Sequence, residues 1–356
     1  MRRLRLCTIL SYSVALCTAC APLAQAADTD SPVLSFQVEN DMFATDTDRH
    51  YTNGLRLSYL TKARSCDPGA TCLSGLLRRI TNVIPAFREG DEHRIAYSLG
   101  QNMFTPTDIE REDLIPDDRP YAGWLYLGLG FVSKSVLEQS PDRDFTRLDR
   151  LELNLGVVGP LSGAEALQKA WHDLFGFRDP RGWDNQIKNE PGLVLNYERQ
   201  WLFKRKKFFF NYLDLEFAPE LGAALGNIFT FAAAGGRIRI GSNLPADYGP
   251  PRIRPSLPGS AFFVAGDRVS GYLFGAIEGR AMLRNIFLDG NSFRDSHSVD
   301  KKHLVGDIQV GAAIVIPRSR LLPPFRLSYT YIWRSKEFDG QDFGDRFGSI
   351  SLSFHL

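Results

Sequence analysis

Long segments of this chain alternate between apolar and polar residues with a period of two. In one of them, Leu55, Leu57 and Tyr59 alternate with Arg56 and Ser58. This alternation indicates β-strands that have one apolar and one polar face. The segments run to roughly 10 to 14 residues, longer than the average of about 5 or 6 in globular sheets and suited to a tilted strand that crosses a bilayer. The pattern therefore favours a transmembrane β-barrel over a soluble β-protein.

Twelve such segments are predicted, and an even number is usual for outer-membrane barrels. They cover 33–40, 53–62, 93–102, 122–133, 148–158, 192–202, 208–221, 228–241, 270–284, 302–316, 324–335 and 346–356. We predict an all-β fold, a twelve-stranded antiparallel transmembrane β-barrel. The connections 63–92 and 242–269 are far longer than usual turns, so they either pack as plugs or elaborations or contain further strands. Small residues that suit a crowded lumen are expected on the inward faces, at Gly128, Gly130, Gly156, Gly275 and Gly279.

The start of the chain has the pattern of an export signal. Three arginines precede an apolar run over 6–23 that ends in Ala24-Gln25-Ala26, the arrangement of a secretory signal peptide. We predict a signal peptide over 1–26 and the barrel over 27–356; a lipoprotein cysteine at Cys20 is the weaker alternative. In an exported chain, Cys66 and Cys72 are expected to form a structural disulfide.

Charge and hydropathy limit which partners and which membrane-spanning segments this chain can have. The chain has 42 Lys and Arg against 41 Asp and Glu, a net charge of +1, so it lacks the basic excess that binds a phosphate backbone and we expect no nucleic-acid partner. After the signal, no apolar run approaches the roughly 18 residues of a spanning helix. The expected location is the outer membrane of a Gram-negative bacterium. The sequence does not indicate an oligomeric state.

One stretch, 162–176, breaks the period-two pattern. It has Ser162 as an N-cap, Glu165 as a capping-box partner and Gly176 as a closing glycine, which together predict one short extracellular helix. Gln168 and His172 are four residues apart, so their side chains share one face of this helix.

Strand parity predicts where the polar groups gather. If the N-terminus lies in the periplasm, each connection from an odd to an even strand lies at the outer surface. The first connection carries Asp41, Asp46, Asp48 and Thr52, the second carries Arg111, and the third carries the helix with Gln168 and His172. Hard oxygen ligands and an imidazole at one rim are the components of a calcium-assisted hydrolase whose active site faces the outer leaflet.

Each component also has a simpler explanation. Asn40 and Asp41 favour turns for backbone reasons, His172 can pack against the barrel rim, and Asp118-Arg119 can be a surface ion pair. The segment after Asp41 is not an EF-hand, because the glycine at its sixth position and the glutamate at its twelfth are absent. Calcium would therefore need ligands from separate strands.

Several motifs, taken together and in order, resemble the lipid A 3'-O-deacylase family of outer-membrane proteins. The resemblance extends over most of the chain after the signal. The matching segments are ENDMF at 39–43, DRHYTNG at 48–54, GQNMFTP at 100–106, DRPYAGW at 118–124, GVVGP at 156–160, Gln168-x3-His172 and WDNQI at 183–187.

The resemblance implies an active site between the outer wall of the barrel and the extracellular helix, where a calcium ion and a histidine remove the 3'-linked acyloxyacyl chain of lipid A. It implies catalytic roles for Asn40, Thr52, Gln168 and His172, with His172 as the base that activates water, and a role for Asp41 in holding calcium. The substrate partner would be lipid A in lipopolysaccharide. Where the family has an important lysine after a Ser/Thr-Pro bend, this chain has Glu110 and Arg111. Arg111 keeps a cationic role toward a phosphate but is planar and longer than lysine.

Two other classes remain open from the sequence. One is a barrel without catalysis, a pore or a structural protein, which would not depend on calcium. The other is a different outer-membrane lipase, although the His-x-Ser-Asn core of those enzymes is only superficially echoed at 295–298.

Overall fold

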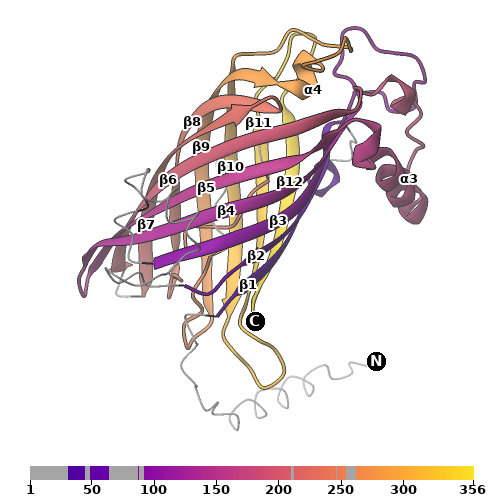
Figure 1. The fold of residues 1–356 in the computed structure, drawn as a ribbon. Helices are drawn as coiled ribbons and strands as arrows, with labels where there is room; N and C mark the ends of the chain where they lie inside the picture. Colours follow the sequence, from indigo (N-terminus) through magenta and orange to yellow (C-terminus); the bar gives the residue numbers. More distant parts are fainter. Residues whose placement is uncertain are drawn as a thin grey trace, which may run out of the picture.

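The computed structural model describes residues 31–44, 49–63, 87, 92–209, 212–245, 247–253 and 262–356. Within them, twelve strands close into an antiparallel barrel in which each strand pairs with its neighbours in sequence and β1 pairs with β12 (Figure 1). The strands are β1 Val33–Asn40, β2 His50–Leu60, β3 Glu92–Thr105, β4 Ala122–Gln139, β5 Arg143–Val158, β6 Glu190–Phe209, β7 Leu213–Gly226, β8 Phe229–Ser242, β9 Ser270–Asn285, β10 Leu304–Ile316, β11 Phe325–Arg334 and β12 Asp345–His355. The predicted twelve-stranded barrel is confirmed.

The turn between β6 and β7 was predicted wrongly. The sequence placed the seventh strand at 208–221, whereas β6 continues to Phe209 and β7 begins at Leu213. The basic run 204–207 has the polar composition of a turn, but in the structure it belongs to β6. Lys204 and Lys206 remain in the strand because they pair with acidic side chains on the neighbouring strands. Lys206 Nζ lies 2.7 Å from an Asp144 carboxylate oxygen, and Lys204 Nζ lies 3.6 Å from one of Asp214.

The strands present apolar side chains outward and polar side chains inward. On β9, Leu273 and Ile277 are 64% and 65% exposed, whereas Glu278 is buried on the opposite face. This parity places Gly275 and Gly279 on the outward face, so their predicted inward position is wrong. Gly128 and Gly130 on β4 and Gly156 on β5 have the parity of buried side chains, so their predicted inward position is correct. The lumen also holds large charged side chains, many of which are paired with an opposite charge.

Paired charges line the inner wall of the barrel. The Asp307 carboxylate on β10 accepts hydrogen bonds from Arg280 Nη2 at 2.9 Å and from Arg334 Nε at 3.0 Å, on the two neighbouring strands. All three side chains are at most 1% exposed. Burial of charge is tolerated when hydrogen-bonded partners compensate for lost water.

The described part of the long connection after β8 packs inside the barrel. We call residues 243–245, 247–253 and 262–269 the plug segment. Asp247 accepts a hydrogen bond from Arg326 at 2.7 Å, and Arg252 donates to Glu39 on β1 at 2.7 Å. On the far side of the lumen, the Tyr248 hydroxyl lies 2.8 Å from that of Thr146 on β5. The plug interpretation of this connection is therefore confirmed, because the segment contacts strands on both sides of the lumen. Burial raises the pKa of Asp247, but Arg239 and Arg326 outweigh it and leave that pKa below its usual value.

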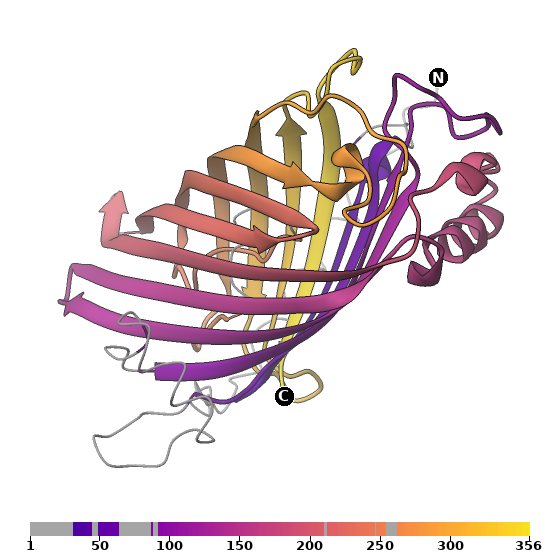
Figure 2. The ribbon, with the colours of Figure 1, turned by 45° about the horizontal axis from the view of Figure 1, so that its top comes forward.

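Aromatic side chains fill the lumen near the end that carries α3. We call this end the α3 rim; the C-terminus lies at the opposite end (Figure 1). A second short helix, α4 Ile286–Asp289, lies at the α3 rim (Figure 2). Its Phe287 stacks on Phe104 with ring centroids 4.1 Å apart, and the Arg119 guanidinium lies 4.9 Å from the Phe104 ring centroid. The sequence predicted only one helix, and it missed α4 because a four-residue element has no measurable period.

The predicted signal peptide and Cys66 and Cys72 fall outside the described residues. Of the connection 63–92, only its ends and Phe87 are described, and Phe87 packs against Phe131 with ring centroids 6.3 Å apart. Among the described helices, none is long and apolar enough to cross a membrane.

Candidate active site

The helix that carries two predicted site residues lies outside the barrel wall. It is α3, Ala164–Phe175, preceded by the 3-10 helix η2, Pro160–Ser162, and it packs beside β3 and β4 (Figures 1 and 2). The close contact depends on Gly123 of β4, where a Cβ would lie 2.4 Å from Ala164 Cβ. Any larger residue at 123 would push the helix away from the wall.

The start of α3 differs from the predicted capping box. The N-cap is Gly163, which adopts a left-handed conformation with φ of 68°. Ser162 Oγ instead donates to the Gly159 carbonyl at 2.6 Å, and Glu165 accepts from Lys169 at 2.7 Å. The hydrogen bond to Glu165 raises the pKa of Lys169. The capping prediction failed because η2 uses the Ser162 hydroxyl two residues before the helix begins.

Four of the predicted site residues line one small cleft between α3 and the barrel wall. The cleft, of about 10 Å³, is bounded by Asn40, Thr52, Gln168 and His172 together with Met42, Asn53, Met103, Leu167 and Trp171. These four side chains come from β1, β2 and α3, and each is buried. The volume is about that of one ordered water.

The first turn at this rim is built around Asn40 and Asp41. Asn40 caps the 3-10 helix η1, Asp41–Phe43, by accepting a hydrogen bond from the Met42 N–H at 2.8 Å. An Asp41 carboxylate oxygen accepts the Arg49 N–H at 2.6 Å, which ties the two ends of the turn together. Asp41 is buried beside the cleft.

Thr52 lies at an irregularity in β2. Tyr51 pairs with Phe104 and Asn53 with Met103, so Thr52 is the extra residue of a β-bulge. A bulge redirects a side chain out of the regular alternation and is common beside active sites. The Thr52 hydroxyl lies 2.6 Å from that of Thr105.

The His172 ring is oriented by a backbone carbonyl. Its Nδ1 hydrogen bonds to the carbonyl oxygen of Arg178, so in the neutral ring Nδ1 carries the proton and Nε2 carries the lone pair. The ring also packs edge-on against Phe177, with centroids 5.7 Å apart. This is the arrangement that a general base requires, with a third group fixing the tautomer.

Gln168 is oriented by a residue that the sequence did not identify as part of the site. Trp183, in the 3-10 helix η3, Gly182–Asn185, donates its indole N–H to Gln168 Oε1 at 2.8 Å. Trp183 matched a family motif, but no local signal in the sequence shows that its partner is Gln168.

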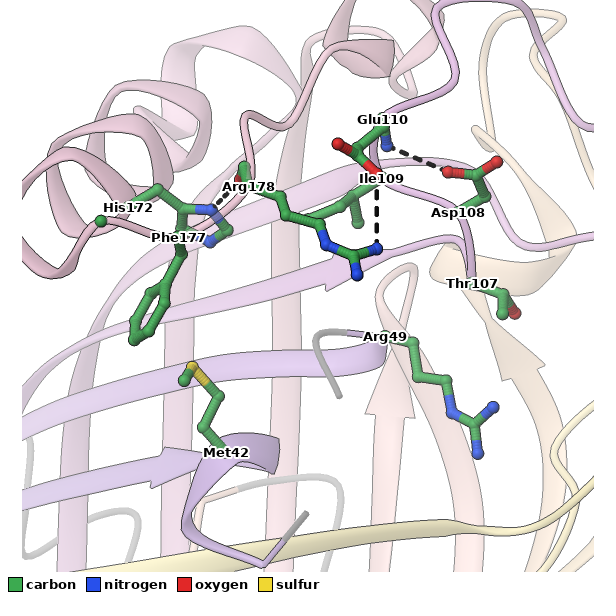
Figure 3. Close-up of a pocket in the computed structure, with 10 residues that line it drawn as sticks. Met42, Arg49, Thr107, Asp108, Ile109, Glu110, His172, Phe177 and Arg178 are labelled. Carbon is green, nitrogen blue, oxygen red and sulfur yellow. Dashed lines mark hydrogen bonds and ion pairs between the residues drawn. The ribbon is translucent and has the colours of Figure 1, made fainter. Parts of the chain in front are cut away.

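A larger cavity of about 420 Å³ opens beside His172. Figure 3 shows its charged groups, Arg49 and Arg178 with Asp108 and Glu110. Arg178 Nη1 lies 3.4 Å from a Glu110 carboxylate oxygen. The remaining lining residues are Met42, Thr107, Ile109, Gly176 and Phe177. The cavity thus combines two guanidinium groups with an apolar portion.

Arg111 does not line the cavity that contains His172. It borders a separate, smaller cavity with Arg119, Tyr121 and Gly182. The bend after Pro106 therefore brings Glu110, not Arg111, toward His172. Arg49 and Arg178 supply the cationic groups there, and the sequence missed both because a single arginine in a loop carries no distinguishing local pattern.

Calcium was predicted at this site, and the donor chemistry is suitable. Asp41, Asn40 and Thr52 each offer a side-chain oxygen, the ligand atom that calcium prefers. Among the described residues, no group of three or more His, Cys, Asp or Glu side chains could hold a metal ion. Asp41 would thus be the carboxylate ligand from this part of the chain, since Asp46 and Asp48 fall outside the described residues.

An apolar outer surface, a filled lumen and a buried polar cleft at one rim define an outer-membrane β-barrel with a site outside its lumen. A family model described as "Outer membrane protein LpxR" matches residues 10–356. The chain therefore belongs to this family.

The fold is similar to that of a solved member of this family. LpxR from Salmonella typhimurium is similar with a TM-score of 0.67 at 19% identity, over 91% of this chain and 100% of that chain. The beta domain of the Bordetella autotransporter BrkA has a TM-score of 0.41 at 10% identity, over 92% of this chain and 100% of that one. A search of curated proteins found no match.

Proposed function

We propose that this protein is a calcium-dependent acyl-ester hydrolase that removes the 3'-linked acyloxyacyl chain of lipid A. Membership of the family supports the coarser assignment, an outer-membrane lipid A deacylase. The observation that carries the proposal is the buried His172, whose Nδ1 is fixed by the Arg178 carbonyl while its ring borders a 420 Å³ cavity. The α3 rim then faces the outside, where lipopolysaccharide lies.

In the proposed reaction, His172 Nε2 takes a proton from a water molecule in the cleft. The water oxygen attacks the ester carbonyl carbon, and the bond from that carbon to the sugar oxygen then breaks. The imidazolium returns its proton to the leaving oxygen, which gives a free carboxylic acid and a sugar hydroxyl. Gln168 holds the water or the ring in position. A calcium ion bound at Asp41 would stabilise the negative charge on the carbonyl oxygen.

The cavity has features that suit a phosphorylated glycolipid. Lipid A carries a phosphate next to its 3' position, and guanidinium groups bind phosphate through charge-assisted hydrogen bonds. Arg49 and Arg178 are the guanidinium groups beside His172, and Met42, Ile109 and Phe177 offer apolar contacts to an acyl chain. Because α3 lies outside the wall, the remaining acyl chains can stay in the membrane.

The structure disfavours the pore alternative. The plug segment lies in the lumen and charged side chains line its wall, with Asp307 and Asp247 paired to arginines on several strands. A structural barrel without catalysis would not require an oriented, buried histidine beside a cavity.

The test is mass spectrometry of lipid A from cells that express the wild-type protein or His172→Ala. Wild type should release the 3' acyloxyacyl chain, and chelation of calcium should stop the release. His172→Ala should abolish it, because loss of a general base costs about 10² to 10⁴-fold in rate. His303→Ala is the matched control, since His303 is exposed and hydrogen bonds to the Met282 carbonyl away from the cleft. Lipid A that is unchanged by the wild-type protein, or equally deacylated by His172→Ala, would refute the proposal.

A further inference from the structure

His50, at the start of β2, has an unusual backbone conformation. Its φ is +64°, and among the described residues only one other non-glycine residue, Asn243, has a positive φ. Residues other than glycine adopt this region rarely, and such strain persists where the surrounding contacts hold it in place. His50 is also buried, with 3% of its surface exposed.

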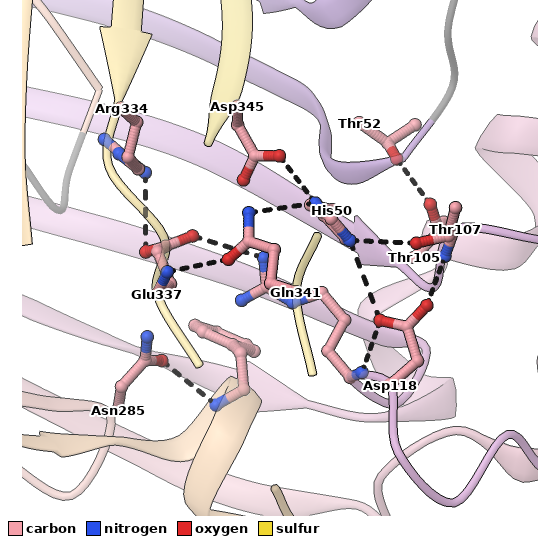
Figure 4. Close-up of polar contacts among 12 residues, drawn as sticks. His50, Thr52, Thr105, Thr107, Asp118, Asn285, Arg334, Glu337, Gln341 and Asp345 are labelled. Carbon is pink, nitrogen blue, oxygen red and sulfur yellow. Dashed lines mark hydrogen bonds and ion pairs between the residues drawn. The ribbon is translucent and has the colours of Figure 1, made fainter. Parts of the chain in front are cut away.

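The His50 ring is held by residues from three different connections or strands. Figure 4 shows its Nδ1 beside Asp345 of β12, at 2.5 Å, and its Nε2 beside the Thr107 hydroxyl, at 3.0 Å. Phe338 packs edge-on against the ring at 5.5 Å between centroids, and an Asp118 carboxylate oxygen lies 3.7 Å from Nε2. The ring therefore joins β12 to the loop that follows β3.

The residues on either side of His50 belong to the candidate active site. The backbone N–H of Arg49 donates to Asp41 at 2.6 Å. Two residues after His50, Thr52 forms the bulge and contacts Thr105 at 2.6 Å. The strained backbone of His50 lies between these two contacts, so a change in its conformation would move both.

We propose that His50 is a positioning residue for the hydrolase, and that its contacts with Asp345 and Thr107 hold the backbone conformation that places Asp41 and Thr52. This inference rests on the proposed function, but nothing in the family motifs assigns a role to the His50 ring. His50 does not border the cleft or the cavity beside His172, so it acts through its neighbours.

The test distinguishes the role of the His50 ring from that of the backbone conformation at this position. His50→Gly tolerates a positive φ but lacks the ring, so kcat on lipid A micelles should fall about 10- to 100-fold, as expected when catalytic groups are misplaced. KM should rise by less than in Arg49→Gln, because the Arg49 side chain that lines the cavity is still present. His50→Asn accepts the left-handed conformation and its amide can donate to Asp345, so it should recover most of kcat. A wild-type kcat for His50→Gly would overturn the proposal.

Asp345→Ala provides the second arm, because it removes the partner and leaves His50 in place. Its kcat should match that of His50→Gly, and the double variant should be no worse than either single variant, the mark of two residues that act as one unit. Multiplied losses in the double variant would overturn the proposal. His303→Gly is the control for loss of a histidine at the same rim.

A physical readout keeps this inference separate from the proposed function. Trypsin cleavage after Arg49, followed by mass spectrometry of the folded protein, should be about tenfold faster in Asp345→Ala than in wild type, because local opening governs proteolysis. The cleavage sequence is the same in both proteins. If the wild type has no deacylase activity, the proposed function fails while this comparison still tests the His50 contacts. Equal cleavage rates would show that His50 does not hold this segment.

Discussion

Trp183→Phe should slow the proposed reaction although Trp183 touches neither water nor substrate in the mechanism. Its indole N–H donates to Gln168 Oε1 at 2.8 Å, and both side chains are at most 2% exposed. Phenylalanine preserves the apolar contact with Tyr121 but removes the donor. A buried acceptor that loses its donor costs about 1 to 3 kcal/mol. If all of that cost falls on the active orientation of Gln168, kcat falls about 5- to 150-fold, at about 1.36 kcal/mol per tenfold.

The assay is the initial rate of fatty-acid release from lipid A micelles by purified protein. Gln168→Ala should lose no less than Trp183→Phe, yet less than His172→Ala, because a water can replace the amide. The double variant Gln168→Ala/Trp183→Phe should equal Gln168→Ala, since the indole acts only through the amide. Trp333→Phe is the control, because Trp333 is 38% exposed. A wild-type rate for Trp183→Phe, or losses that multiply in the double variant, would refute the reasoning.

Two further predictions concern substrate binding and the plug. Arg49→Gln and Arg178→Gln should each raise KM for lipid A about tenfold or more, because a lost charge-assisted hydrogen bond costs about 1.5 to 3 kcal/mol. The increase in KM should vanish for lipid A that lacks the phosphate beside the 3' position. In the same kinetic assay, Arg111→Gln should leave KM unchanged. Asp247→Asn should destabilise the barrel by about 3 to 5 kcal/mol in urea unfolding, because it leaves buried guanidinium groups without a counter-charge, whereas exposed Asp342→Asn should not. Because the pKa of Asp247 is lowered in the folded protein, its contribution to the free energy of unfolding is complete above the unfolded pKa of about 3.9. That contribution is lost as pH falls through the folded pKa. Asp247→Asn should therefore remove this part of the loss of stability in acid.

The sequence alone determined the barrel and most of its strands. Alternation with a period of two is a local property, because successive side chains of a strand point to opposite faces, so twelve amphipathic segments could be located without any tertiary information. The helix was visible for the same reason, because Ala166, Leu167, Ala170, Trp171 and Leu174 recur at helical spacing. Parity of the strands then placed Asp41, Thr52 and His172 at one rim, and the structure brings Thr52 and His172 to one cleft.

Only the tertiary structure decided which side chains meet. His50 contacts Asp345, 295 residues away, and Arg252 contacts Glu39, 213 residues away. No window of sequence contains both partners. The bulge at Thr52 depends in the same way on its pairing with β3. Period and propensity describe a strand by itself, whereas bulges, buried ion pairs and the orientation of a catalytic ring arise from the closed barrel, which places distant residues within hydrogen-bonding distance and removes the water that would otherwise solvate them.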